Sequence, residues 1–167
     1  MNAYKIPFAG LKVGIHSYDF EVDQSFFEHF DYSDIGESAI QIHVDLDRRE
    51  HMMVFNVVIE GKAKVLCDRC QEEVEISLEL EEQLIVKFGD HTSGFDEEIV
   101  ILGPHEHIFD LTHFFFEFCH LALPPKRVHA DIRECNEDVI KVLEEMTFAD
   151  EQDDTDPRWD ALRGLVD

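Results

Sequence analysis

The sequence predicts an α+β fold: an antiparallel β-meander followed by two to three helices packed on the sheet, then an acidic linker and a short C-terminal helix. Two observations predict it. Apolar and polar residues alternate in the middle of the chain, as in half-buried strands, and the apolar period lengthens to that of a helix in the last third. We therefore expect one domain over residues 1–149 and a tail over residues 150–167.

The N-terminal half carries the expected strands. It begins with extended segments broken by Pro7, Gly10 and Gly14, and Asp23 is placed to cap a short helix that ends near Phe30. Alternation, or a buried apolar run, then predicts strands at residues 40–47, 54–59, 61–66 and 73–80, with a short edge strand at 98–102. We expect these strands to form an antiparallel meander.

The C-terminal third carries the expected helices. Apolar residues recur at helical spacing from Leu111 to Ala122, Asp110 is placed to cap this helix, and Pro124-Pro125 ends it. A loop to about Asn136 precedes a second helix over residues 137–147.

The tail differs from the rest in composition. Residues 150–156 carry five acids and no base, which predicts a solvated linker. Pro157 then begins a short helix with Trp159, Leu162 and Leu165 on one side. We expect this helix either to dock on the sheet or to bind a partner, with Trp159 as a contact residue.

The chain is strongly acidic, with 38 Asp and Glu residues against 14 Lys and Arg and a formal charge of −24. A surface of this sign repels phosphate backbones and anionic lipids, which argues against generic binding to DNA, RNA or membranes. It suits a basic protein partner, although a high net charge also serves solubility alone.

Sequence signals favour the cytoplasm. Apolar runs stay short of the ~18 residues of a membrane-spanning helix, and the N-terminal segment lacks the apolar core of a signal peptide. In the cytoplasm the four cysteines would be reduced, so they would serve as metal ligands, core residues or nucleophiles.

The most specific local motif is Cys67-Asp68-Arg69-Cys70. It lies between two predicted strands, which favours a metal-binding knuckle at a hairpin tip over a redox pair at the start of a helix. Structural zinc takes four ligands, and His129 and Cys135, in the loop after Pro124-Pro125, are the best candidates for the other two. The alternative is a tight turn with two free thiols and no metal.

A closed site of this kind would fix structure and would not activate water. Three thiolates, one imidazole and zinc carry a net charge of about −1, which Arg69 and Arg127 are placed to offset. We also interpret Arg69 and Arg127 as candidate partner-binding residues, because they are the basic side chains nearest the predicted site.

Other chemistry-bearing residues favour a structural or surface role. Cys119 lies on the apolar helix stripe and is expected in the core, whereas His113, Glu117 and His120 share the opposite, polar face. We find no glycine-rich phosphate loop and no nucleophile motif in the sequence. These observations predict a protein that is not an enzyme.

Three stretches, in this order, resemble the YceD family of large ribosomal RNA subunit accumulation proteins. They are Gly61 to Cys70, then Leu121 to Pro124 leading to Val128-His129 and Cys135, and last Asp156 to Trp159 with Leu162 and Leu165. The resemblance spans residue 40 or so to the C-terminus. Many members of the family have a cysteine-rich second half, where this chain has His129 and Cys135.

The resemblance implies a non-catalytic role in large-subunit ribosomal RNA accumulation or processing, and in assembly of the large ribosomal subunit. Given the acidity, we expect an adaptor that holds a basic ribosomal protein or assembly factor and meets the rRNA precursor particle indirectly. Two alternatives stay open: a metal-dependent hydrolase or nuclease on precursor rRNA, and an acidic mimic of nucleic acid.

Overall fold

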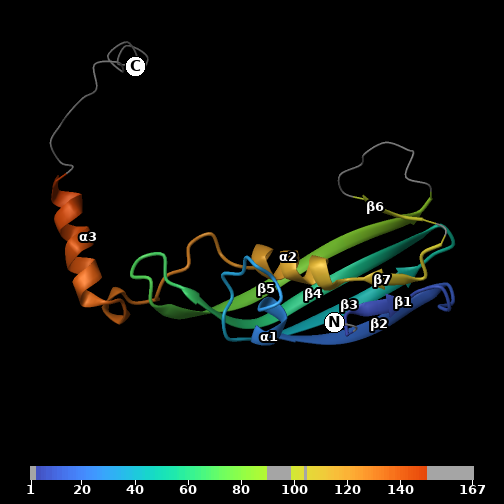
Figure 1. Ribbon diagram of the computed structural model, residues 1–167, viewed down its shortest axis with the longest axis horizontal. Helices are drawn as coiled ribbons and strands as arrows, with labels where there is room; N and C mark the ends of the chain where they lie inside the picture. Colours follow the sequence, from blue (N-terminus) through green and yellow to red (C-terminus); the bar gives the residue numbers. More distant parts are fainter. Residues whose placement is uncertain (1–2, 90–98, 104, 150–167) are drawn as a thin grey trace, which may run out of the picture.

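The computed structural model describes residues 3–89, 99–103 and 105–149 of the chain (Figure 1). Its main element is a five-stranded sheet of order β2-β3-β4-β5-β6, accompanied by a two-stranded β1–β7 ribbon. The strands span Lys5–Pro7 (β1), Gly14–Asp23 (β2), Ser38–Arg48 (β3), Met52–Leu66 (β4), Glu73–Phe88 (β5), Ile99–Leu102 (β6) and Ile108–Asp110 (β7). With three helices added, the described chain confirms the predicted α+β class.

The alternating pattern of β3 decides which face of the sheet is buried. Ile40, Ile42, Val44 and Leu46 are at most 2% exposed, whereas the residues between them face solvent more openly. Successive side chains of a strand point to opposite faces, so one set of residues forms the core and the other forms the solvent face. The antiparallel pairing of β2 through β5 confirms the predicted meander.

Gly61 joins two segments that the sequence separates. The sequence predicts one strand that ends at residue 59 and another that starts at residue 61, but β4 runs unbroken from Met52 to Leu66. A Cβ at Gly61 would lie 2.4 Å from the carbonyl oxygen of Ala39 and 2.7 Å from the Cα of Ile40. Glycine here therefore permits a close approach of β3 to β4.

The edge strand β6 confirms the short strand expected near residues 98–102, but it pairs differently from its neighbours. It lies parallel to β5, with Ile85 opposite Ile99 and Phe88 opposite Leu102. The meander is thus antiparallel from β2 to β5 only. The difference arises because strand direction depends on the path of the connecting segment, whereas apolar alternation is the same in both directions.

Two helices contribute to the core beside the sheet (Figure 1). The first, α1 (Gln24–Phe27), is capped by Asp23 as predicted, and the second, α2 (Thr112–Leu121), buries Phe115 and Cys119. The ring of Phe115 lies 5.1 Å from that of Phe20 in β2. Asp110 accepts a hydrogen bond of 3.0 Å from the amide of Thr112, but the N-cap residue of α2 is Leu111, one residue later than the sequence predicts.

The third helix, α3 (Glu137–Ala149), projects beyond the end of the sheet (Figure 1). Val139 and Ile140, in its first turn, are partly buried against the core. Further along, Val142 is 49% exposed and Met146 64% exposed. The expectation that the helices pack on the sheet is therefore met by α1 and α2, while α3 contacts the core through Val139 and Ile140 and has exposed side chains from residue 141 to residue 146.

The expected linker at residues 150–156, the last helix from Pro157 and the predicted contact residue Trp159 lie outside the described residues. Among the helices that the structure describes, none combines the length and the apolar character needed to cross a membrane.

Candidate metal centre

The first half of the site is the tip of the β4–β5 hairpin, residues 67–72. The carbonyl of Cys67 accepts a 2.8 Å hydrogen bond from the amide of Gln71, and the amide of Cys67 donates one of 2.8 Å to the carbonyl of Glu72. Gln71 adopts a left-handed φ of 61°, which lets the chain reverse within this short turn. The turn is the knuckle that the Cys-x-x-Cys spacing predicts.

The loop between α2 and α3 is held against this tip by Asp68 and Arg127. The amide of Asp68 donates to the carbonyl of Arg127, and the amide of Arg127 donates to the Asp68 carboxylate, each over 2.7 Å. The Arg127 guanidinium also lies 3.0 Å from the Asp34 carboxylate. These bonds position His129, which follows two residues later.

Cys135 enters the site between a 3-10 turn, Ile132–Glu134, and the start of α3. The next residue, Asn136, accepts a 3.0 Å hydrogen bond from the amide of Asp138 and thereby caps α3. Its amide group also donates to the Glu72 carboxylate over 2.9 Å. The same short segment therefore supplies one ligand and ties α3 to the hairpin tip.

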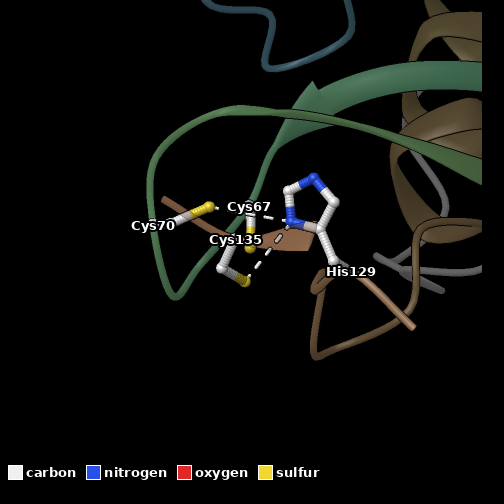
Figure 2. A group of neighbouring side chains, drawn as sticks. All are labelled: Cys67, Cys70, His129 and Cys135. Atoms are coloured by element: carbon white, nitrogen blue, oxygen red, sulfur yellow. Dashed lines mark hydrogen bonds between the residues drawn. The ribbon is translucent and has the colours of Figure 1, made fainter. Parts of the chain in front are cut away.

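Figure 2 shows that the side chains of Cys67, Cys70, His129 and Cys135 point toward one another. Their ligand atoms all lie within 4.8 Å of one another. Nδ1 of His129 is 3.6 Å from Sγ of Cys70 and 3.5 Å from Sγ of Cys135. Zinc–sulfur and zinc–nitrogen bonds of ~2.3 and ~2.05 Å at a tetrahedral angle give an N···S separation of about 3.6 Å. The spacing thus fits a tetrahedral metal.

The protonation of His129 follows from its second nitrogen. Nε2 lies 3.2 Å from the carbonyl oxygen of Glu73, and a carbonyl only accepts hydrogen bonds. Nε2 must therefore carry the proton, which leaves the lone pair of Nδ1 directed at the thiols. A backbone carbonyl in this place holds a metal-binding imidazole in the correct tautomer and orientation.

The thiols are buried, and their surroundings favour ionisation of Cys67. Cys67 is 0% exposed, Cys70 4% and Cys135 5%. Burial alone would raise the pKa of Cys67, but the backbone amides of Arg69, Cys70 and His129 outweigh it and lower that pKa to about 6. Burial and the adjacent Cys70 raise the pKa of Cys135.

Arg69 supplies positive charge beside the sulfur atoms. Its Nη1 lies 3.7 Å from Sγ of Cys135. A Cys3His set with three thiolates and a divalent metal has a net charge of about −1, so a guanidinium beside it offsets the excess. Arg127 is 59 residues from Asp68 in the chain and is engaged by that carboxylate and by Asp34, not by the thiols.

The structure brings together all four ligands predicted from the sequence and keeps other candidates apart. Cys119 is fully buried on α2, and burial raises its pKa to about 12, as fits a core residue. His113 pairs with Glu117 over 3.1 Å, and His120 contacts the carbonyl of Phe116. Neither joins a metal cluster within the described part of the chain.

Sequence reasoning missed the residues that hold the two halves of the site together. Asp68, Asp34 and Asn136 carry these contacts. An Asn directly before a helical pattern is a capping signal, so the sequence alone indicates Asn136 as the capping residue of the second predicted helix. Asp34 had no such signal, because its contact with Arg127 spans 93 residues.

Several basic side chains near the site are engaged by carboxylates. Lys62 lies 2.7 Å from Glu75, and Lys64 forms an ion pair with Glu37. Arg127 pairs with Asp34 and Asp68, whereas Arg69 lies beside the Cys135 thiol. A phosphate backbone binds to clustered, unneutralised Lys and Arg, and these ion pairs neutralise part of the positive charge around the site.

Comparison with protein families gives one match. The model described as "Large ribosomal RNA subunit accumulation protein YceD" covers residues 55–166, a range that contains all four candidate ligands. Neither the curated proteins nor the solved structures contain a match to this chain.

Proposed function

This chain belongs to the YceD family of large ribosomal RNA subunit accumulation proteins, and from that premise we propose that it is a non-catalytic assembly factor. In this proposal it supports accumulation and processing of large-subunit rRNA by holding a basic ribosomal protein or assembly factor. The observation that carries the proposal is the combination of a formal charge of −24 with the pairing of Lys62, Lys64 and Arg127 to carboxylates. Such a surface attracts basic proteins and repels bare RNA.

A structural zinc is part of the proposal. The donor set of Cys67, Cys70, His129 and Cys135 suits zinc, since thiolate and imidazole are its preferred ligands. The metal would join the hairpin tip to the segment that leads into α3, as the Asp68–Arg127 and Glu72–Asn136 contacts do. Its contribution would be to folding, because metal binding to a preformed site adds to the free energy of unfolding.

The rival function, a metal-dependent nuclease, needs a coordination position open to water and a general base beside it. Four protein ligands complete a tetrahedron, and the three thiols are at most 5% exposed. The geometry therefore favours a structural over a catalytic role for this centre.

A capture experiment tests the adaptor. The purified chain is immobilised and mixed with proteins extracted from washed large ribosomal subunits, at about 50 and about 300 mM salt. We expect basic ribosomal proteins to bind at low salt and to be released as charge is screened. As a control for simple charge attraction, the same immobilised chain is mixed with proteins extracted from small ribosomal subunits.

The alternatives predict other results. A nuclease would cleave a precursor rRNA transcript, and the Cys70→Ser variant would lose that cleavage. A nucleic-acid mimic would bind an RNA-processing enzyme and be displaced by duplex RNA. Either result, or equal capture of proteins from both subunits, would overturn the adaptor.

A further inference from the structure

The projecting helix α3 has an apolar stripe that is partly exposed in the described part of the chain. Val139, Val142 and Met146 recur at the i, i+3 and i+7 positions of one helix face. Val139 is partly buried against the core, but Val142 is 49% and Met146 64% exposed. The stripe therefore begins against the core and continues through exposed residues. These residues lie on the helix that projects beyond the sheet (Figure 1).

A helix of this length and placement is expected to have a partner. Isolated helices of about 12–15 residues are marginal in water, and most helices gain their stability by packing an amphipathic face. α3 spans 13 residues, and Val139 and Ile140 in its first turn pack against the core. Scattered exposed apolar residues are common, but a stripe at helical spacing on a projecting helix is typical of helix-in-groove recognition.

The charges on α3 indicate the chemistry of that partner. The polar side of the helix carries Glu137, Asp138, Glu144 and Glu145 against a single base, Lys141. Asp138 and Glu145 are seven residues apart, so they follow the same side of the apolar stripe. Flanking charges of this kind select a helix with complementary charges in coiled-coil-like pairs.

We propose that α3 is the docking element of this protein, and that its occupant is a basic amphipathic helix of a partner protein. The partner places apolar residues on Val142 and Met146 and Lys or Arg residues beside Asp138 and Glu145. The inference rests on the proposed adaptor function, because it names the segment and the partner chemistry through which the adaptor would act.

The candidate metal centre supports this role by orienting the helix. Cys135 is the residue directly before the capping residue Asn136, which also bonds to Glu72 at the hairpin tip. α3 is thereby held at its N-terminal end, while its residues 141–146 are exposed. A docking helix that is already folded and oriented loses less entropy when it binds.

The test uses the full chain and a defined probe, a Leu/Lys peptide designed as an amphipathic helix. Val142→Gln/Met146→Gln removes the apolar contacts while keeping charge and helix propensity. We expect this variant to bind the peptide about tenfold more weakly, the effect of truncating a central interface contact. Asp138→Asn/Glu145→Gln should weaken binding and reduce its dependence on salt. A scrambled peptide of the same composition should bind weakly to the wild type and to every variant.

A matched control comes from the opposite end of the molecule. Val13→Gln/Ile15→Gln replaces residues that are 67% and 73% exposed and should leave peptide affinity unchanged. Circular dichroism should show unchanged helix content for every variant.

Several outcomes would overturn the inference. Equal peptide binding by the wild type and the α3 variant would show that charge alone attracts the peptide. Concentration-dependent dimerisation that Val142→Gln/Met146→Gln abolishes would assign the stripe to a second copy. Protection of residues 150–167 from hydrogen exchange that the same variant removes would assign it to the chain's own tail. If wild type captures no large-subunit protein, the adaptor itself fails; if the α3 variant captures them equally well, only the docking element fails.

Discussion

Removing one ligand of the candidate metal centre should unfold the contacts around it. In the Cys70→Ser variant, Nδ1 of His129 loses a thiolate partner that lies 3.6 Å away, and the four-ligand set is incomplete. A metal present at 100 to 1,000 times its dissociation constant stabilises the native state by about 2.7 to 4.1 kcal/mol. A chain of 150–250 residues changes its Tm by about 2–4 °C per kcal/mol, so we expect a fall of roughly 10 °C.

The assay combines metal content, melting and hydrogen exchange. Protein purified without chelator should contain about one equivalent of zinc, and Cys70→Ser should contain almost none. Exchange should increase over residues 128–136, while the β3–β4 strands stay protected. The control is Cys119→Ala, which removes a buried thiol outside the site and should keep its zinc.

A specific set of results would refute the reasoning. Less than about a tenth of an equivalent of zinc in wild type, with Cys67 and Cys70 alkylated readily in the native state, would mean a metal-free turn. So would an unchanged Tm when chelator is added to the wild type.

Three further predictions address the sheet and the cell. The pKa of His43 is raised, mainly because its ring hydrogen-bonds to Asp19 at 2.6 Å. The contact therefore stabilises the folded state fully below the unfolded pKa of ~6.5, and this stabilisation is lost as the pH rises through the pKa of the folded state. NMR titration should show a lower pKa for His43 in Asp19→Asn, and an identical value in both would contradict this. Gly61→Ala should cost about 2–3 kcal/mol by overlap with the Ala39 carbonyl, whereas Gly10→Ala, with open space around it, should change stability by less than about 0.5 kcal/mol in denaturant titrations. Depletion of the protein in cells should lower mature large-subunit rRNA and largely spare small-subunit rRNA, measured by quantitative RNA analysis; equal loss of both would count against the proposed function.

The local pattern predicted most of the secondary structure because the responsible signals are local. The alternation from Ile40 to Leu46 and the capping role of Asp23 can each be recognised within a short stretch of consecutive residues. Gly61 shows the limit of such reasoning: glycine signals a break in a strand as readily as a close approach, and only the neighbouring strand distinguishes them.

The direction of β6 and the placement of α3 were beyond the local pattern. An apolar run in β6 is compatible with parallel or antiparallel pairing, because side chains alternate between the two faces in either direction. The amphipathic period of α3 predicts that one face will be covered, but not by what. The sequence therefore indicated a helix, and the fold placed it beyond the sheet.

What the sequence determined by itself is the donor chemistry of the candidate centre: Cys67 and Cys70 as a spaced pair, with His129 and Cys135 as the remaining candidates. What only the tertiary structure decided is that these four atoms lie within 4.8 Å, that the Glu73 carbonyl directs Nδ1 of His129 to the thiols, and that α3 starts there. The physical reason is range. Residue identity and spacing determine the local structure over a few neighbouring residues. The approach of residue 129 to residue 73 depends instead on how the chain between them packs.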